Sequence, residues 1–124
     1  VLISVVILAI GLLGLAGLQM ASQKNNQSAQ FRTHAVIQAY SLIDRMRLNK
    51  LESYGLVMTS TAPVGPLRKD TDLSAWISEL NALLPAGAGE VTVNGNIVSV
   101  AVRWDDTRGT SGSDIQVFSV STEL

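Results

Sequence analysis

The feature that most constrains this chain is its first eighteen residues, which contain no charged side chain and only one polar side chain, Ser4. As an α-helix that rises about 1.5 Å per residue, this stretch is roughly 27 Å long, close to the thickness of the hydrocarbon layer of a bilayer. A helix on the surface of a soluble protein has a polar face, and this stretch has none. The sequence therefore predicts, over 1–18, a transmembrane helix or a helix inside an equally apolar bundle.

Two simpler interpretations apply to the same stretch. Ala16 and Ala21 supply small residues for signal-peptide cleavage, but a signal peptide has an apolar region of about 7 to 15 residues after a basic start, and this run is longer and begins directly at Val1. An ordinary membrane anchor fits the hydropathy equally well. What argues against a simple anchor is that the helical pattern continues beyond the apolar stretch without a break.

The segment 19–52 is polar but keeps a helical pattern. It contains no Pro and no Gly, although the chain has 10 Gly and 3 Pro. Its apolar residues recur mostly at three- and four-residue steps, which places them on one face of a helix. The members of this face are Ala29, Val36, Tyr40, Ile43, Met46 and Leu51. We therefore predict one helix over 1–52, about 80 Å long, whose first part is apolar and whose second part is amphipathic.

Three glycines, Gly11, Gly14 and Gly17, lie at three-residue spacing in the apolar stretch. Each lowers helix propensity by about 1 kcal/mol relative to Ala. They share an arc of about 120° on the helix, where a second backbone can approach closely, although Gly is also simply common in membrane helices. Close packing is one interpretation, and local loosening of the helix is a second. The residues that we predict for helix packing and polymerisation are Val1, Val5, Leu8, Gly11, Leu12, Gly14, Leu15 and Gly17.

The first part of the head, 53–124, combines a loop with a second helix. The segment 53–70 is rich in Pro, Gly, Ser and Thr and is typical of a surface loop. Apolar residues at helical spacing then predict a helix over 72–84, with Asp72 or Thr71 as its N-cap. Pro85 ends this helix.

The second part of the head predicts an antiparallel sheet. Side chains alternate over 90–93, 97–104 and 115–121, and Asn94-Gly95 is typical of a tight turn between two strands. We expect the sheet to pack on the amphipathic part of the first helix, which gives an α+β fold. The predicted core residues are Tyr40, Ile43, Met46, Trp76, Leu80, Val100 and Trp104.

Composition excludes several classes of function. The chain has 124 residues, which allow one globular domain beside the helix. Nine basic and ten acidic residues give a net charge of −1, so the chain has no field that attracts nucleic acid. The absence of Cys excludes disulfides, thiolate metal sites and Cys nucleophiles.

The sequence offers few residues for a chemical site. Its single histidine, His34, is best explained as a solvated or partly packed helix residue. Asp105, Asp106 and Asp114 are weak candidates for a calcium site, but their spacing fits no EF-hand, and a solvated loop over 105–114 is the main interpretation. The sequence contains neither a phosphate-binding loop nor a nucleophile elbow. We therefore expect no catalytic residues, no cofactor and no enzymatic activity.

Four stretches carry a family resemblance that covers nearly the whole chain. They are VLISVVILAIGLLGLAGLQ at 1–19, DRMRLN at 44–49, DLSAWISELNALLP at 72–85 and VRWDD at 102–106. The first stretch resembles the type IV pilins, in which an apolar N-terminal helix continues into an amphipathic helix and a small head. The other three stretches resemble, more narrowly, the minor pilins of the PilV kind.

The resemblance implies a life cycle and a set of partners. Such proteins are made with a short basic leader, cleaved and N-methylated by a prepilin peptidase, held in the inner membrane by one helix with the head in the periplasm, and then extracted into a pilus. The implied partners are other minor pilins, the major pilin, the inner-membrane assembly platform and a PilY-type adhesin, without nucleic acid. The class has a Glu just before the part that matches Val1, and we expect this chain to be a truncated member that lacks it.

Two other functions stay open at the level of the sequence. A minor pseudopilin of a type II secretion system shares the same helix and head. A membrane-tethered periplasmic domain that binds a ligand or partner, and never polymerises, has the same hydropathy. The codons upstream of Val1 would separate this last class from the other two, because it has no prepilin leader.

Overall fold

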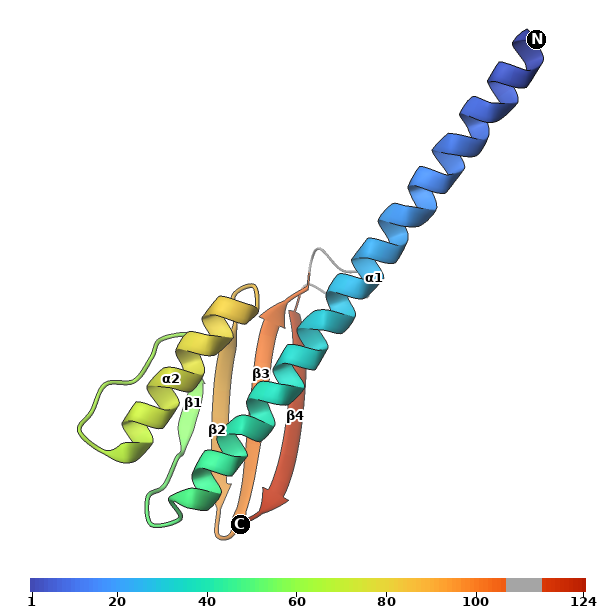
Figure 1. Ribbon diagram of the computed structural model, residues 1–124. Coiled ribbons are helices and arrows are strands. Elements are labelled where there is room, and N and C mark those ends of the chain that lie inside the picture. The colour runs from blue at the N-terminus through green and yellow to red at the C-terminus, as the bar shows by residue number, and fades with distance from the viewer. Residues whose placement is uncertain (107–114) are drawn as a thin grey trace.

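The computed structural model describes residues 1–106 and 115–124, in which one long helix carries a four-stranded sheet on its second half (Figure 1). The elements in chain order are α1 (Leu2–Leu48), β1 (Leu56–Thr59), α2 (Arg68–Leu83), β2 (Ala88–Asn94), β3 (Ile97–Asp105) and β4 (Ile115–Glu123). This α+β arrangement agrees with the fold class predicted from the sequence.

α1 is a single helix of 47 residues that continues from the apolar stretch into the head. The prediction of one continuous helix is confirmed, but α1 ends at Leu48 and not at residue 52. Asn49 leaves helical geometry, with φ −133° and ψ 62°, and its N–H donates to the Met46 carbonyl at 3.1 Å. Arg45 and Arg47 lie in the last turn, where positive charge interacts favourably with the carbonyl end of the helix dipole.

The four strands form one antiparallel sheet in the order β1-β2-β3-β4. The three predicted strands are confirmed with longer bounds, whereas β1 lies inside the segment 53–70, which was predicted to be a loop. β1 has only four residues and an irregular register with β2 between Leu56 and Thr59, so it has no alternation long enough to reveal it. Between β2 and β3, Gly95 has a φ of 61°, a conformation that the predicted tight turn requires.

α2 begins at Arg68, four residues before the predicted start. The predicted caps Asp72 and Thr71 are therefore wrong, because both lie inside the helix. Instead, the Asp70 carboxylate accepts a hydrogen bond from the Leu67 N–H at 3.1 Å. This interaction satisfies a backbone donor at the helix start and places negative charge near the positive end of the helix dipole.

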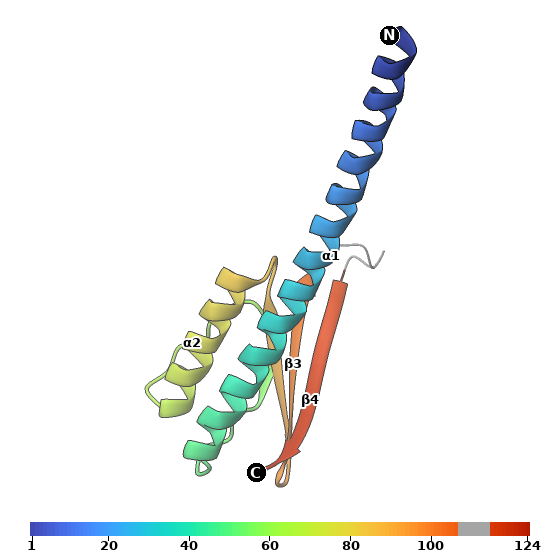
Figure 2. The same cartoon turned by 45° about the vertical axis from the view of Figure 1, so that its right-hand side comes forward.

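Both helices cover the same face of the sheet, as Figures 1 and 2 show. From β3, the buried side chains are Val98, Val100, Val102 and Trp104, as the alternation predicted over 97–104 requires. α1 buries Ala35, Ala39, Leu42, Ile43 and Met46, and α2 buries Leu73, Trp76, Ile77 and Leu80. The prediction that the sheet packs on the second half of the first helix is confirmed.

The prediction that Tyr40 belongs to the core is wrong, because its side chain is 50% exposed. The buried face of α1 contains Ala35, Ala39, Leu42, Ile43 and Met46. Tyr40 follows Ala39 and is turned about 100° away from it around the helix. The other six predicted core residues are buried: Ile43, Met46, Trp76, Leu80, Val100 and Trp104.

Trp76 connects three elements of the core. Its side chain is fully buried, and its Nε1–H donates to the Gln38 carbonyl of α1 at 3.0 Å. On the other side the ring lies against Gly89 of β2, where an added Cβ would overlap the ring atoms. The predicted role of Trp76 as a core anchor is confirmed.

Candidate functional site

The first half of α1 projects beyond the head (Figure 1), and residues 1–20 of the chain are all exposed. The segment Leu2–Met20 has a mean hydropathy of 2.4, and none of it is buried. It is long and apolar enough to cross a membrane, which agrees with a single-pass membrane anchor. Because so much apolar surface is unfavourable in water, this half of α1 requires lipid or another apolar surface around it.

Of the eight residues predicted for helix packing, Val1 directly precedes α1 and the other seven lie on its exposed half. A Cβ added to Gly11, Gly14 or Gly17 would meet no other atom within 4 Å. The three glycines therefore form an open strip on the helix, and larger side chains fit there in the isolated chain. Their packing role stays a prediction, since it concerns a neighbouring helix.

A polar contact marks the point where α1 meets the head. Ser28 Oγ donates to the two carboxylate oxygens of Asp106, at 3.1 and 3.3 Å, and Asp106 is only 4% exposed. Because Asp106 follows the last residue of β3, this contact attaches α1 to one end of the sheet. Sequence reasoning did not find it, because the two residues are 78 positions apart.

The weak metal candidates do not come together in the described part of the chain. Asp105 belongs to β3 and not to a loop, and its N–H donates to the Pro85 carbonyl at 2.8 Å. Asp106 is directed at Ser28, and Asp114 lies outside the described residues. Within residues 1–106 and 115–124, no group of three His, Cys, Asp or Glu side chains is placed to hold a metal ion. His34 is partly buried on α1, as expected for a partly packed helix residue.

A buried polar network lies at the far end of α1. The Tyr54 hydroxyl contacts the Asp72 carboxylate, which also accepts from Arg68 Nε at 3.2 Å, and Asn49 Nδ2 donates to the Tyr54 oxygen at 3.1 Å. Burial, followed by the hydrogen bond to Asp72, raises the pKa of Tyr54 from 10.0 to about 12. The network holds a neutral phenol beside a carboxylate and joins the elements around it.

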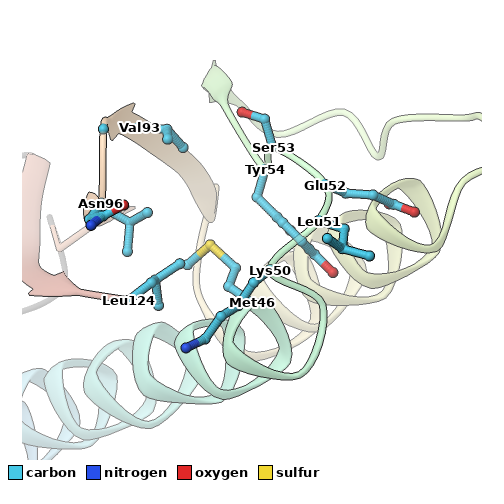
Figure 3. Close-up of a pocket in the computed structure, with 11 residues that line it drawn as sticks. Met46, Lys50, Leu51, Glu52, Ser53, Tyr54, Val93, Asn96 and Leu124 are labelled. Atoms are coloured by element: carbon cyan, nitrogen blue, oxygen red, sulfur yellow. The ribbon is translucent and has the colours of Figure 1, made fainter.

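A pocket of about 280 Å³ opens next to this network (Figure 3). Its wall comes from the end of α1, the segment 50–54, the hairpin between β2 and β3, and Leu124. Apolar side chains such as Met46 and Val98 alternate there with Lys50, Glu52 and Asn96. No sequence pattern indicates this pocket, because segments that are far apart in the chain form it.

No family model, no curated protein and no solved structure matches this chain. A functional argument therefore depends on two features of the chain itself. One is the exposed apolar half of α1, and the other is the head that the second half of the same helix carries.

Proposed function

We propose that this chain is a minor pilin, a subunit that takes part in type IV pilus biogenesis by priming assembly or by joining the tip complex. The observation that carries the proposal is the continuity of α1, which joins an exposed apolar half to a half buried in the head. The resemblance of four stretches to minor pilins of the PilV kind supports the same class.

The physical argument begins with the environment of the apolar half. An all-apolar helix has no hydrophobic reason to leave lipid unless a similarly apolar environment receives it. A bundle of parallel apolar helices inside a fibre is such an environment. Contacts between unlike surfaces of neighbouring subunits then propagate and do not close, which yields a helical fibre.

The proposal includes a location and a set of partners. Before assembly, α1 spans the inner membrane once, and the head lies in the periplasm. After assembly, the chain is part of the extracellular pilus. The partners are other minor pilins, the major pilin and the inner-membrane assembly platform, together with a PilY-type adhesin.

The experiment that tests the proposal enlarges a side chain on the glycine strip. Gly14→Leu places bulk between Gly11 and Gly17, where a neighbouring helix is expected to lie. Ala16→Leu is the matched control, because it adds bulk about 200° around the helix from Gly14. The amount of each variant in pili sheared from producing cells is compared with the amount left in the membrane.

We expect Gly14→Leu to lower the amount of chain in sheared pili at least tenfold, with an unchanged amount in the membrane, and Ala16→Leu to behave like the unaltered chain. Equal incorporation of the two variants into pili would show that the glycine strip is not where a neighbouring helix packs. If the unaltered chain never enters pili, the proposal fails. Recovery in a secretion pseudopilus would then favour the pseudopilin, and retention in the membrane alone would favour the tethered binding domain.

A further inference from the structure

The two edges of the sheet differ in how well they are protected against pairing with another strand. β1 is four residues long and has an irregular register with its neighbour, and both features discourage edge-to-edge pairing. β4 is nine residues long and pairs with β3 in regular register from Ile97↔Glu123 to Asp105↔Ile115. It contains no Pro, Gly or Lys, and Glu123 is its only charged residue. Within the strand itself, β4 therefore lacks the short length, the irregular register and the Pro or Lys that often block an edge strand.

The backbone of β4 offers a row of hydrogen-bonding groups on the side away from β3. The Leu124 N–H donates to the Asn96 carbonyl at 2.8 Å, which makes this opposed pair a hydrogen-bonded one. Because hydrogen-bonded and non-bonded pairs alternate along an antiparallel ladder, the N–H and C=O groups of Val117, Ser119 and Ser121 point away from β3. Among the described strands, β3 is the only neighbour of β4 (Figure 2). These outward N–H and C=O groups are the ones with which a further strand would pair.

The side chains beside this edge favour an apolar partner. Phe118 and Val120 face the helices, but they are only partly buried against the core. Arg47 Nη2 donates to Thr122 Oγ1 at 3.5 Å, which places this side of α1 next to β4. Tyr40 lies seven residues before Arg47 on the same side of α1 and is 50% exposed. A strand added beyond β4 would cover Phe118 and Val120 and extend beneath Tyr40.

We propose that β4 binds an extended segment of a partner chain as a fifth, antiparallel strand, with an apolar side chain at every second position. Main-chain hydrogen bonds supply the affinity in such strand addition, and the alternate side chains supply the specificity. The proposal goes beyond the proposed function, because it holds whether or not the chain polymerises.

The antiparallel arrangements with a second copy do not fit a shared membrane. If β4 paired antiparallel with β4 of another copy, the second α1 would point in the opposite direction. If β4 paired with β1 of another copy, the twist of about 20–25° per strand over four strands would turn the second α1 by about 80–100°. Both arrangements move the second apolar half out of the layer that holds the first. A single extended segment is free of this restriction.

The test uses the full chain in detergent micelles and a fluorescently labelled peptide with the sequence of β3, residues 97–105. This peptide is a suitable probe because β3 is the antiparallel partner of β4 within the sheet, and its valines alternate with other residues. Ser119→Pro removes an N–H that points away from β3, so it costs no hydrogen bond within the sheet. Ser119→Ala is the matched control, because it removes the hydroxyl and keeps the N–H.

We expect the peptide to bind the unaltered chain and Ser119→Ala equally, and Ser119→Pro at least tenfold more weakly, with unchanged circular dichroism. Bound peptide should slow hydrogen exchange at the amides of Val117, Ser119 and Ser121. Two further versions of the peptide carry backbone N-methyl groups, one on the odd-numbered and one on the even-numbered residues. One version should bind and the other should not, because only one of these two sets of N–H groups faces β4. Absence of peptide binding, or equal binding to the proline and alanine variants, would overturn the proposal. So would dimerisation of the chain alone that Ser119→Pro abolishes, since the edge would then belong to a second copy.

Discussion

The hydroxyl of Tyr54 donates a hydrogen bond of 2.6 Å to the carboxylate of Asp72, and both side chains are buried. Tyr54 lies between the end of α1 and β1, and Asp72 lies in the second turn of α2. Arg45 of α1 donates to the Asp72 carbonyl at 3.2 Å, so the same residue also contacts the first helix. A buried carboxylate requires such partners, and these contacts hold the two helices and the start of β1 together.

Replacing Tyr54 by Phe removes one partner of the buried Asp72 carboxylate and leaves its shape nearly unchanged. We expect Tyr54→Phe to lower the free energy of unfolding by about 1–3 kcal/mol, because a buried acceptor loses its donor. Urea unfolding of the full chain in detergent micelles, followed by the fluorescence of Trp76 and Trp104, measures the change. Tyr40→Phe is the matched control and should leave the unfolding free energy unchanged, since Tyr40 is half exposed. Equal effects of the two substitutions would contradict this role for Tyr54.

The raised pKa of Tyr54 predicts a loss of stability at high pH. Burial and the bond to Asp72 raise this pKa to about 12 in the folded chain, against 10.0 as the ordinary value. Between these two values the unfolded chain loses the phenol proton and the folded chain keeps it, so the free energy of unfolding falls as pH rises. Below 10.0 the contribution of Tyr54 is fully present. Unfolding free energies measured across this range should show a smaller decline in Tyr54→Phe, and identical declines would refute the prediction.

The contact between Gly89 and Trp76 predicts that a single methyl group destabilises the head. In Gly89→Ala the new Cβ overlaps the ring of Trp76, which is fully buried. We expect a loss of about 1–3 kcal/mol of unfolding free energy, as in other overpacked cores. Gly14→Ala adds the same methyl group where no atom lies within 4 Å and should cause no loss. A neutral Gly89→Ala would show that the ring can shift.

A charge placed in the apolar half of α1 should weaken membrane insertion. Leu12 lies near the middle of the segment Leu2–Met20, where a Lys costs about 2.5–3.5 kcal/mol of apparent insertion free energy. We expect the share of Leu12→Lys that stays with washed membranes to fall. Ile37→Lys introduces the same charge at an exposed position of α1 within the head and should leave that share unchanged. Equal retention of both variants would argue against a membrane-spanning role for Leu2–Met20.

The sequence alone was sufficient for the elements with long and regular patterns. The run without charge over 1–18, the absence of Pro and Gly after it, and the alternation of Val98, Val100 and Val102 predicted α1 and β3 correctly. The pattern failed for Tyr40, because apolar residues occur on two sides of the helix and the buried side is the one that carries Ala35 and Ala39. The sequence also predicted that the first half of α1 is apolar on all sides, whereas the packing role of its residues stays a prediction.

What the sequence by itself determined is which segments are helical or extended, and which half of α1 is apolar on all sides. These properties depend on residues that are close together in the chain, where spacing alone reveals them. Only the tertiary structure decided that β1 is a strand, that Asp72 and Asp106 are buried, and that β4 is the last strand in the sheet order. The physical reason is that each of these depends on partners far away in sequence, such as Ser28 for Asp106 and β2 for β1, and a local pattern carries no record of them.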